Sequence, residues 1–199
     1  MRDEVKLGMM NAECGMRDDP LSVHRSPSSI HHLFSSLRPH PSALRCVIVW
    51  LILATLTLLF VSMIIIAPVA EAYGYSSTAL IIYTSFGKFC HQIAERSFYI
   101  DGHPFAVCAR CTGIYFGFAA GVLFYPLVRS LNRVDAPARK WLLLALVPTA
   151  IDFALGFFGI VENTHLSRFI TGALLGGVTA FYVVPGLIDM SRIIFKHSS

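Results

Sequence analysis

Three of the five cysteines lie in one short polar segment, and a histidine follows the first of them. These residues are Cys90 with His91 beside it, and Cys108 and Cys111, which form a Cys-x-x-Cys pair. The spacing of such a pair lets both sulfurs reach one centre from a tight turn, and Cys90 and His91 can complete a tetrahedron. The segment therefore predicts a site for zinc or another transition metal with Cys90, His91, Cys108 and Cys111 as ligands. His103 and His165 are further candidates for the nitrogen ligand.

Two other interpretations of these cysteines stay open. Cys111 lies at the start of a predicted helix, where a thiol is more easily ionised, so Cys108 and Cys111 would suit a membrane thiol–disulfide oxidoreductase with a quinone as electron acceptor. The third interpretation is a non-catalytic scaffold or assembly factor with a structural disulfide. No nucleotide-binding glycine-rich loop and no serine nucleophile motif occurs in the sequence, so no enzyme class is predicted.

A single carboxylate interrupts an otherwise uncharged apolar run at residues 141–161. It belongs to Asp152. A lone carboxylate in a membrane costs about 2.5–3.5 kcal/mol on insertion scales, so it should face the protein interior and have a partner. Arg110 and Arg168, at the ends of neighbouring apolar runs, are the available cations. We expect Arg110, Asp152 and Arg168 to form an intramembrane polar cluster, which would serve either helix register or a reaction.

Transmembrane helices must position these residues. The chain is 55% hydrophobic and only 14% charged, whereas soluble domains are about 25% charged. Four apolar runs approach or exceed the length of about 20 residues that a membrane-spanning helix needs. They are residues 46–70, 112–128, 141–161 and 169–188. We therefore predict an all-α integral membrane protein with a four-helix transmembrane domain at 46–190, and an interfacial helix and loop at 71–111 before the second span.

The distribution of basic residues predicts the orientation. Eight basic residues fall on one side of the predicted membrane: Arg38, Arg45, Arg129, Arg133, Arg139, Lys140, Arg192 and Lys196. By the positive-inside rule, both termini lie in the cytoplasm and the cysteine segment lies on the external face of the plasma membrane. Residues 1–45 have the composition of a disordered cytoplasmic tail, and 191–199 form a second tail.

Glycines at four-residue spacing indicate how the helices pack. They are Gly113, Gly117 and Gly121 in the second span, and Gly172 and Gly176 in the fourth. Small residues on one face allow helices to approach closely. The expected partner of the protein is the lipid bilayer, and association of identical copies into a homo-oligomer is a further expectation. Because the basic residues are explained by membrane topology, no nucleic-acid partner is predicted.

Two stretches of the chain carry a family resemblance. The first comprises Cys90, His91, Gln92, Arg96, Ser97, Phe98, Gly102 and residues 108–117, and the second comprises Pro148, Ile151, Asp152, Asn163, Arg168, Thr171, Gly172 and Gly176. The chain resembles, over about residues 83–186, a prokaryotic family of predicted membrane proteins known only as a domain of unknown function. The resemblance implies a small multi-pass protein of the bacterial or archaeal plasma membrane and no assigned activity. Where it implies Gly after Asp152 and Gln three positions later, the chain has Phe153 and Gly156.

Overall fold

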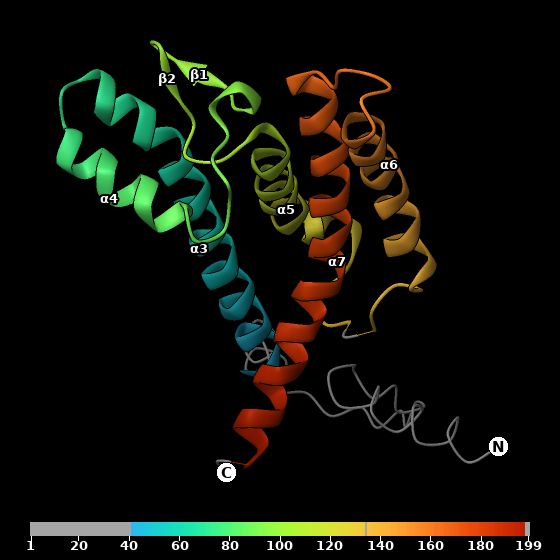
Figure 1. Ribbon diagram of the computed structural model, residues 1–199. Coiled ribbons are helices and arrows are strands. Elements are labelled where there is room, and N and C mark those ends of the chain that lie inside the picture. The colour runs from blue at the N-terminus through green and yellow to red at the C-terminus, as the bar shows by residue number, and fades with distance from the viewer. Residues whose placement is uncertain (1–40, 134, 198–199) are drawn as a thin grey trace, which may run out of the picture.

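The computed structural model describes residues 41–133 and 135–197 (Figure 1). Most of the predicted tail at 1–45 lies outside these residues, and 41–45 belong to the first described helix. The elements in chain order are α3 (Pro41–Ala72), α4 (Ser76–Phe86), the 3-10 helix η1 (Ala94–Arg96), β1 (Tyr99–Ile100), β2 (His103–Pro104), α5 (Ala109–Val128), α6 (Lys140–Phe157) and α7 (His165–His197).

Four of the helices are long and apolar enough to cross a membrane. Their candidate spans are Leu44–Ala72 in α3, Ala109–Val128 in α5, Lys140–Phe157 in α6 and His165–Ile194 in α7. Many large apolar side chains on them are exposed, as expected where lipid replaces water. Helix α4 has 11 residues, about half the length that a span requires. The predicted all-α membrane fold with four transmembrane helices is therefore confirmed.

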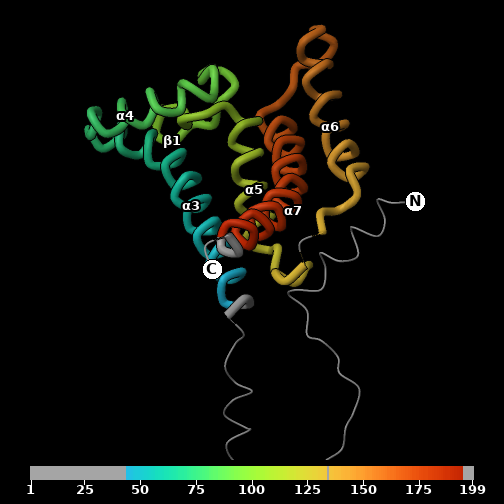
Figure 2. The backbone as a smooth tube through the Cα atoms, turned by 90° about the horizontal axis from the view of Figure 1, so that it is seen from below, coloured from blue at the N-terminus to red at the C-terminus, as the bar shows by residue number. Residues whose placement is uncertain are grey.

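The four long helices lie in the spatial order α3, α5, α7, α6, which differs from their order in the chain (Figures 1 and 2). Helix α4 packs against α3, and α6 packs against α7. Helices α5 and α7 run in the same direction and make the most extensive contact in the protein. Their N-terminal ends therefore lie at the same end of the molecule.

Glycines make the close contact between α5 and α7 possible. A Cβ atom added to Gly117 would lie 2.6 Å from the Cα of Ala173, and one added to Gly176 would lie 2.8 Å from the carbonyl carbon of Ile114. Real Cβ atoms do not approach backbone this closely, so only glycine allows the two helices this separation. The predicted glycine faces do pack against each other.

Two helix ends differ from the apolar runs in the sequence. Helix α6 ends at Phe157, before residue 161, because Gly159 has a φ of +65° and the Ile160 N–H donates to the Leu155 carbonyl at 3.0 Å. This is the Schellman arrangement that stops helices. Helix α7 continues beyond residue 188 to His197. No proline or glycine interrupts it there, so backbone hydrogen bonding extends past the apolar run.

A short β-hairpin, which the sequence analysis did not predict, precedes α5. Strands β1 and β2 pair antiparallel, with Tyr99 opposite Pro104 and Ile100 opposite His103. Between them Asp101 and Gly102 have φ values of 48° and 83°. Asp-Gly is a strong signal for the two-residue turn that needs positive φ at both positions. The hairpin returns the chain to the start of α5.

Candidate functional site

Three sulfur atoms converge where the loop after α4 meets the start of α5. The Sγ atoms of Cys90, Cys108 and Cys111 all lie within 4.8 Å of one another. Those of Cys108 and Cys111 are 3.5 Å apart. All three residues are free cysteines. The structure thus brings together three of the four residues that the sequence analysis named as metal ligands.

The start of α5 positions two of these sulfurs. Cys108 is the N-cap residue, with extended backbone (φ −65°, ψ 159°), and Cys111 lies in the first helical turn. The backbone N–H of Cys108 donates to the Sγ of Cys90 at 3.3 Å, which ties the loop to the helix. Cys90 in turn follows α4, and its N–H donates to the Phe86 carbonyl at 3.0 Å. Two segments of backbone, the loop after α4 and the start of α5, therefore hold the three cysteines in place.

Gln92 fixes the loop that carries Cys90, a role the sequence analysis did not predict. Its backbone has a positive φ of 49°. Its side-chain amide donates to the carbonyls of Tyr83 at 2.7 Å and Ala106 at 2.8 Å. The only sequence signal for this role was the place of Gln92 in the run of residues that carries the family resemblance.

A tyrosine joins α4 to the hairpin. The hydroxyl of Tyr83 donates to the carbonyl of Pro104 at 2.5 Å. Burial, with a smaller effect from Glu71, raises the pKa of Tyr83, so the phenol stays protonated and remains a donor. Tyr83 and Gln92 together connect α4, the Cys90 loop and the segment that leads into α5.

Hydrogen bonds favour the ionised form of Cys90. Hydrogen bonds from the thiols of Cys108 and Cys111 hold the pKa of Cys90 well below its usual value, and they outweigh the opposing effect of burial. The Cys90 side chain is also shielded, because the residue is 6% exposed. A thiolate is the form of cysteine that binds metals and acts as a nucleophile. Cys90 therefore supplies a sulfur that can bind a metal ion or act as a nucleophile.

The histidines stay outside the group of sulfurs. His91 is exposed, and within the described residues the group of potential ligands that lie within 4.8 Å of one another contains only the three cysteines. The sharp bend at Gln92 accompanies this placement, although His91 does line the same cavity as the sulfurs. His165 is held elsewhere, since its Nε2 lies 3.0 Å from the carbonyl of Glu95. His103 belongs to β2.

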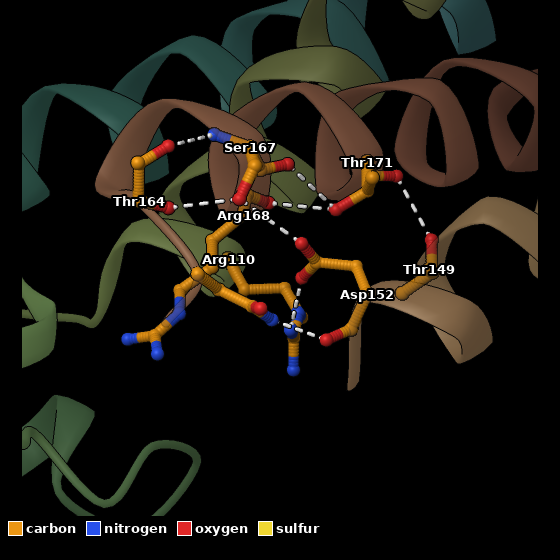
Figure 3. Close-up of polar contacts among 8 residues, drawn as sticks. Arg110, Thr149, Asp152, Thr164, Ser167, Arg168 and Thr171 are labelled. Carbon is orange, nitrogen blue, oxygen red and sulfur yellow. Dashed lines mark hydrogen bonds and ion pairs between the residues drawn. The ribbon is translucent and has the colours of Figure 1, made fainter. Parts of the chain in front are cut away.

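Asp152 lies at the centre of a polar network that joins α5, α6 and α7 (Figure 3). Its carboxylate forms an ion pair with Arg110, which joins α6 to α5, and Ser167 on α7 donates to Oδ1 at 3.0 Å. The side-chain amide of Asn163 donates to the Asp152 backbone carbonyl. The amide of Asn163 lies against Gly156, where a Cβ would meet its nitrogen at 2.9 Å. A larger residue at position 156 would therefore displace Asn163.

Of the two arginines predicted to pair with Asp152, only Arg110 does so in the described part of the chain. Arg110 and Asp152 are in contact, with 21% and 11% of their side chains exposed. No ion pair or hydrogen bond of the Arg168 guanidinium is present within residues 41–133 and 135–197. Ser167 and Asn163, which the sequence analysis did not assign to the cluster, contact Asp152 instead. The sequence held one sign that Ser167 belongs to the cluster, because Ser167 directly precedes Arg168, which was assigned to it.

A cavity of about 320 Å³ lies between the sulfurs and the arginines. Its lining falls into sulfur, cationic and apolar parts. The residues are Cys90, Cys108 and Cys111, then Arg96, Arg110 and Arg168, then Phe89, Ile93, Phe153 and Phe157, with His91, Gly156 and Asn163 between them. The three sulfurs could coordinate a soft metal ion and leave a further position open, or two of them could form a disulfide.

Comparisons with known proteins agree with the membrane fold. The family model described as "Predicted membrane protein (DUF2085)" matches residues 90–182, which include the sulfurs and Asp152. The chain is similar to an uncharacterised protein of Methanocaldococcus jannaschii, with 36% identity over 152 residues that cover 74% of this chain and 97% of the relative. It is also similar to an uncharacterised protein of Methanothermobacter thermautotrophicus, with 38% identity over 91 residues, 46% of this chain and 80% of the relative.

No solved structure matches the chain significantly. The archaeal relatives are consistent with the prokaryotic family that the sequence analysis indicated. The similarity to the first relative covers 74% of this chain, so it extends well beyond the cysteine segment. The chain therefore belongs to the family of multi-pass membrane proteins described as predicted membrane protein DUF2085.

Proposed function

We propose that the protein binds a transition metal ion, with zinc as the leading candidate, through Cys90, Cys108 and Cys111. The observation that supports this proposal is the convergence of three sulfur atoms within 4.8 Å of one another. Structural and catalytic zinc sites both use cysteine thiolates, and the favoured ionisation of Cys90 provides the first of them. Thiolate ligands also select soft metals over magnesium and calcium.

The three sulfurs leave a fourth coordination position of the metal ion to be filled. His91 lies on the wall of the same cavity as the three sulfurs, and a change of its side-chain rotamer would be needed before it could bind. A water molecule or a bound ligand is the other candidate for that position, as in catalytic zinc sites. Three protein ligands with an open fourth position would give a reactive centre, whereas a closed four-ligand site would be structural.

The proposed location is the plasma membrane, with the sulfurs on its external face. The connection between α5 and α6 carries Arg129, Arg133 and Arg139, and Arg192 lies near the same end on α7. The positive-inside rule assigns this end to the cytoplasm. Both described chain ends, the start of α3 and the end of α7, lie on that side in Figure 1.

Elemental analysis of the purified protein tests metal binding. The full chain should be purified in mild detergent under reducing conditions without chelator, and its metal content should approach one equivalent. Replacing Cys108 by Ser should reduce the content to a small fraction, because two sulfurs bind soft metals far less tightly than three.

The matched control is Cys46→Ser, since Cys46 is also buried but lies in an apolar cluster away from the other sulfurs. This variant should keep the full metal content. Metal well below one equivalent in the unmodified protein, or equal loss in both variants, would refute the proposal.

One distance favours a second candidate function, a thiol–disulfide oxidoreductase. The Sγ atoms of Cys108 and Cys111 are 3.5 Å apart, so little movement is needed to join them. Forming the disulfide removes two electrons and two protons from the two thiols, and a quinone that accepts both becomes the quinol. Alkylation of cells before and after mild reductant should then reveal two additional reactive thiols. Thiols that are fully alkylated without reductant would exclude this function.

A further inference from the structure

We infer that the cavity beside the sulfurs binds an anion that carries a phosphate group. Arg96, Arg110 and Arg168 line it, and no aspartate or glutamate among the described residues does. Guanidinium groups bind phosphate in a two-pronged geometry, and several together provide both charge and orientation. This inference does not depend on the metal, because the arginines rather than the sulfurs carry it.

The charges around the cavity do not cancel. Asp152 neutralises Arg110, while the guanidinium groups of Arg96 and Arg168 have no ion-pair or hydrogen-bond partner in the described part of the chain. A divalent metal ion held by three thiolates would add one negative charge and still leave an excess positive charge. A cationic cavity at the end of a membrane domain attracts anions.

A buried donor gives independent support. The Nε atom of Arg110 is buried and has no hydrogen-bond partner within residues 41–133 and 135–197. A buried donor without a partner costs free energy, and an anion that accepted a hydrogen bond from this Nε would remove that cost. The N-terminal turns of α5 and α7 carry Arg110 and Arg168, and helix N-termini add partial positive charge at the same place.

The apolar wall of the cavity suggests where the phosphate comes from. Phe157 is 73% exposed and Phe89 is 71% exposed, and both line the cavity. A phosphate on a lipid headgroup would place acyl chains beside such aromatic surfaces, whereas inorganic phosphate or a soluble phosphate ester would leave them unused. The shared chemistry is the phosphate, and the experiment distinguishes its sources.

Calorimetric titration of the delipidated full chain in nonionic detergent tests the inference. The probes are inorganic phosphate, short-chain phosphatidylglycerol and, as a zwitterionic control, short-chain phosphatidylcholine. We expect saturable binding of one or both anionic probes and binding of phosphatidylcholine that is at least about tenfold weaker. Binding of inorganic phosphate would indicate a soluble ligand, and binding of phosphatidylglycerol alone would indicate a lipid.

The decisive variant is Arg168→Gln, which should weaken binding by at least about tenfold because it removes a charged hydrogen-bond donor from the cavity. Arg133→Gln makes the same charge change in the exposed connection at the opposite end and should leave binding unchanged. If Arg168→Gln fails to fold, Arg96→Gln on the exposed η1 segment replaces it.

No binding of either anionic probe, or equal weakening by Arg133→Gln, would overturn the inference. The metal content of the same samples should be measured in parallel. Anion binding by protein without metal would leave the inference intact and refute only the metal proposal. Metal binding without anion binding would leave the metal proposal intact and refute the inference of an anion site.

Discussion

The two ends of the helical domain use similar residues in different ways. At the sulfur end, where α5 and α7 begin, Cys90 from the loop after α4 converges with Cys108 and Cys111 from the start of α5. At the opposite end Cys46 is buried in an apolar cluster with residues such as Tyr125 and Ile188. The Nη2 of Arg192 donates to the Cys46 sulfur at 3.4 Å. A buried cysteine is therefore uninformative in itself, and convergence is what indicates chemistry.

The ion pairs at the two ends differ in the same manner. Arg129 and Asp135 at the opposite end are six residues apart, lie 3.0 Å from each other and leave 55% of the Asp135 side chain exposed. Arg110 and Asp152 at the sulfur end are 42 residues apart and join two helices. The first pair is local and its carboxylate is solvated, whereas the second joins separate elements and its arginine lines the cavity. Matched substitutions at the two ends should separate these roles.

The largest difference is expected for the two aspartates. Replacing Asp152 by Asn should lower the free energy of unfolding by about 3 kcal/mol, because it leaves Arg110 without its counter-charge in a largely buried position. Asp135→Asn should cost less than about 1 kcal/mol, since the Asp135 side chain is 55% exposed and solvent weakens its attraction to Arg129. Unfolding in mixed detergent and dodecyl sulfate micelles measures both. Equal losses would show that the two ion pairs are energetically alike.

Gly172 and Gly186, in the two halves of α7, provide the next comparison. Gly172→Ala should lower the free energy of unfolding by about 1–3 kcal/mol, because the new Cβ would meet the Arg110 carbonyl oxygen and would lie 3.1 Å from the Ile114 nitrogen. Gly186→Ala has nothing within 4 Å, so it should be neutral or stabilise the helix by up to about 1 kcal/mol. The same unfolding titration applies. Destabilisation by Gly186→Ala, with Gly172→Ala tolerated, would contradict the described α5–α7 contact.

The smallest difference is expected for two tyrosines. Tyr83→Phe removes the hydrogen bond to Pro104 and should cost about 1 kcal/mol. Tyr125 at the opposite end has a buried hydroxyl with no partner among the described residues, so Tyr125→Phe should be neutral or slightly stabilising. Thermal unfolding in detergent can rank the two variants. A larger loss for Tyr125→Phe would reveal a partner for its hydroxyl.

Much of the fold could be predicted from simple sequence features. Uncharged apolar runs identify spans because lipid offers no compensation for exposed charge. Glycines at four-residue spacing indicated which faces meet, and the contact of Gly117 with Ala173 is the result. The end of α6 was harder to predict from the sequence, since it depends on the positive φ of Gly159 rather than on hydropathy. The hairpin was missed although Asp101-Gly102 is a strong turn signal.

The candidate site was predictable only in part, because sequence spacing constrains neighbours better than distant partners. The short separation of Cys108 and Cys111 in the sequence made their proximity expected. Asp152 pairs with Arg110 rather than with Arg168, and this depends on how α5, α6 and α7 pack. The exposed position of His91, next to the bend at Gln92, was not indicated by any pattern in the sequence. Metal binding itself stays a prediction.

The parallel contact between α5 and α7 has a consequence for how the chain is assembled in the bilayer. Two neighbouring helices that run in the same direction must be joined by a third crossing, and α6 provides it. The glycine face of α5 therefore meets lipid until both later segments have been inserted. Loss of α6 would reverse the direction in which α7 is threaded and abolish the contact between α5 and α7, even though every residue of that contact would still be present.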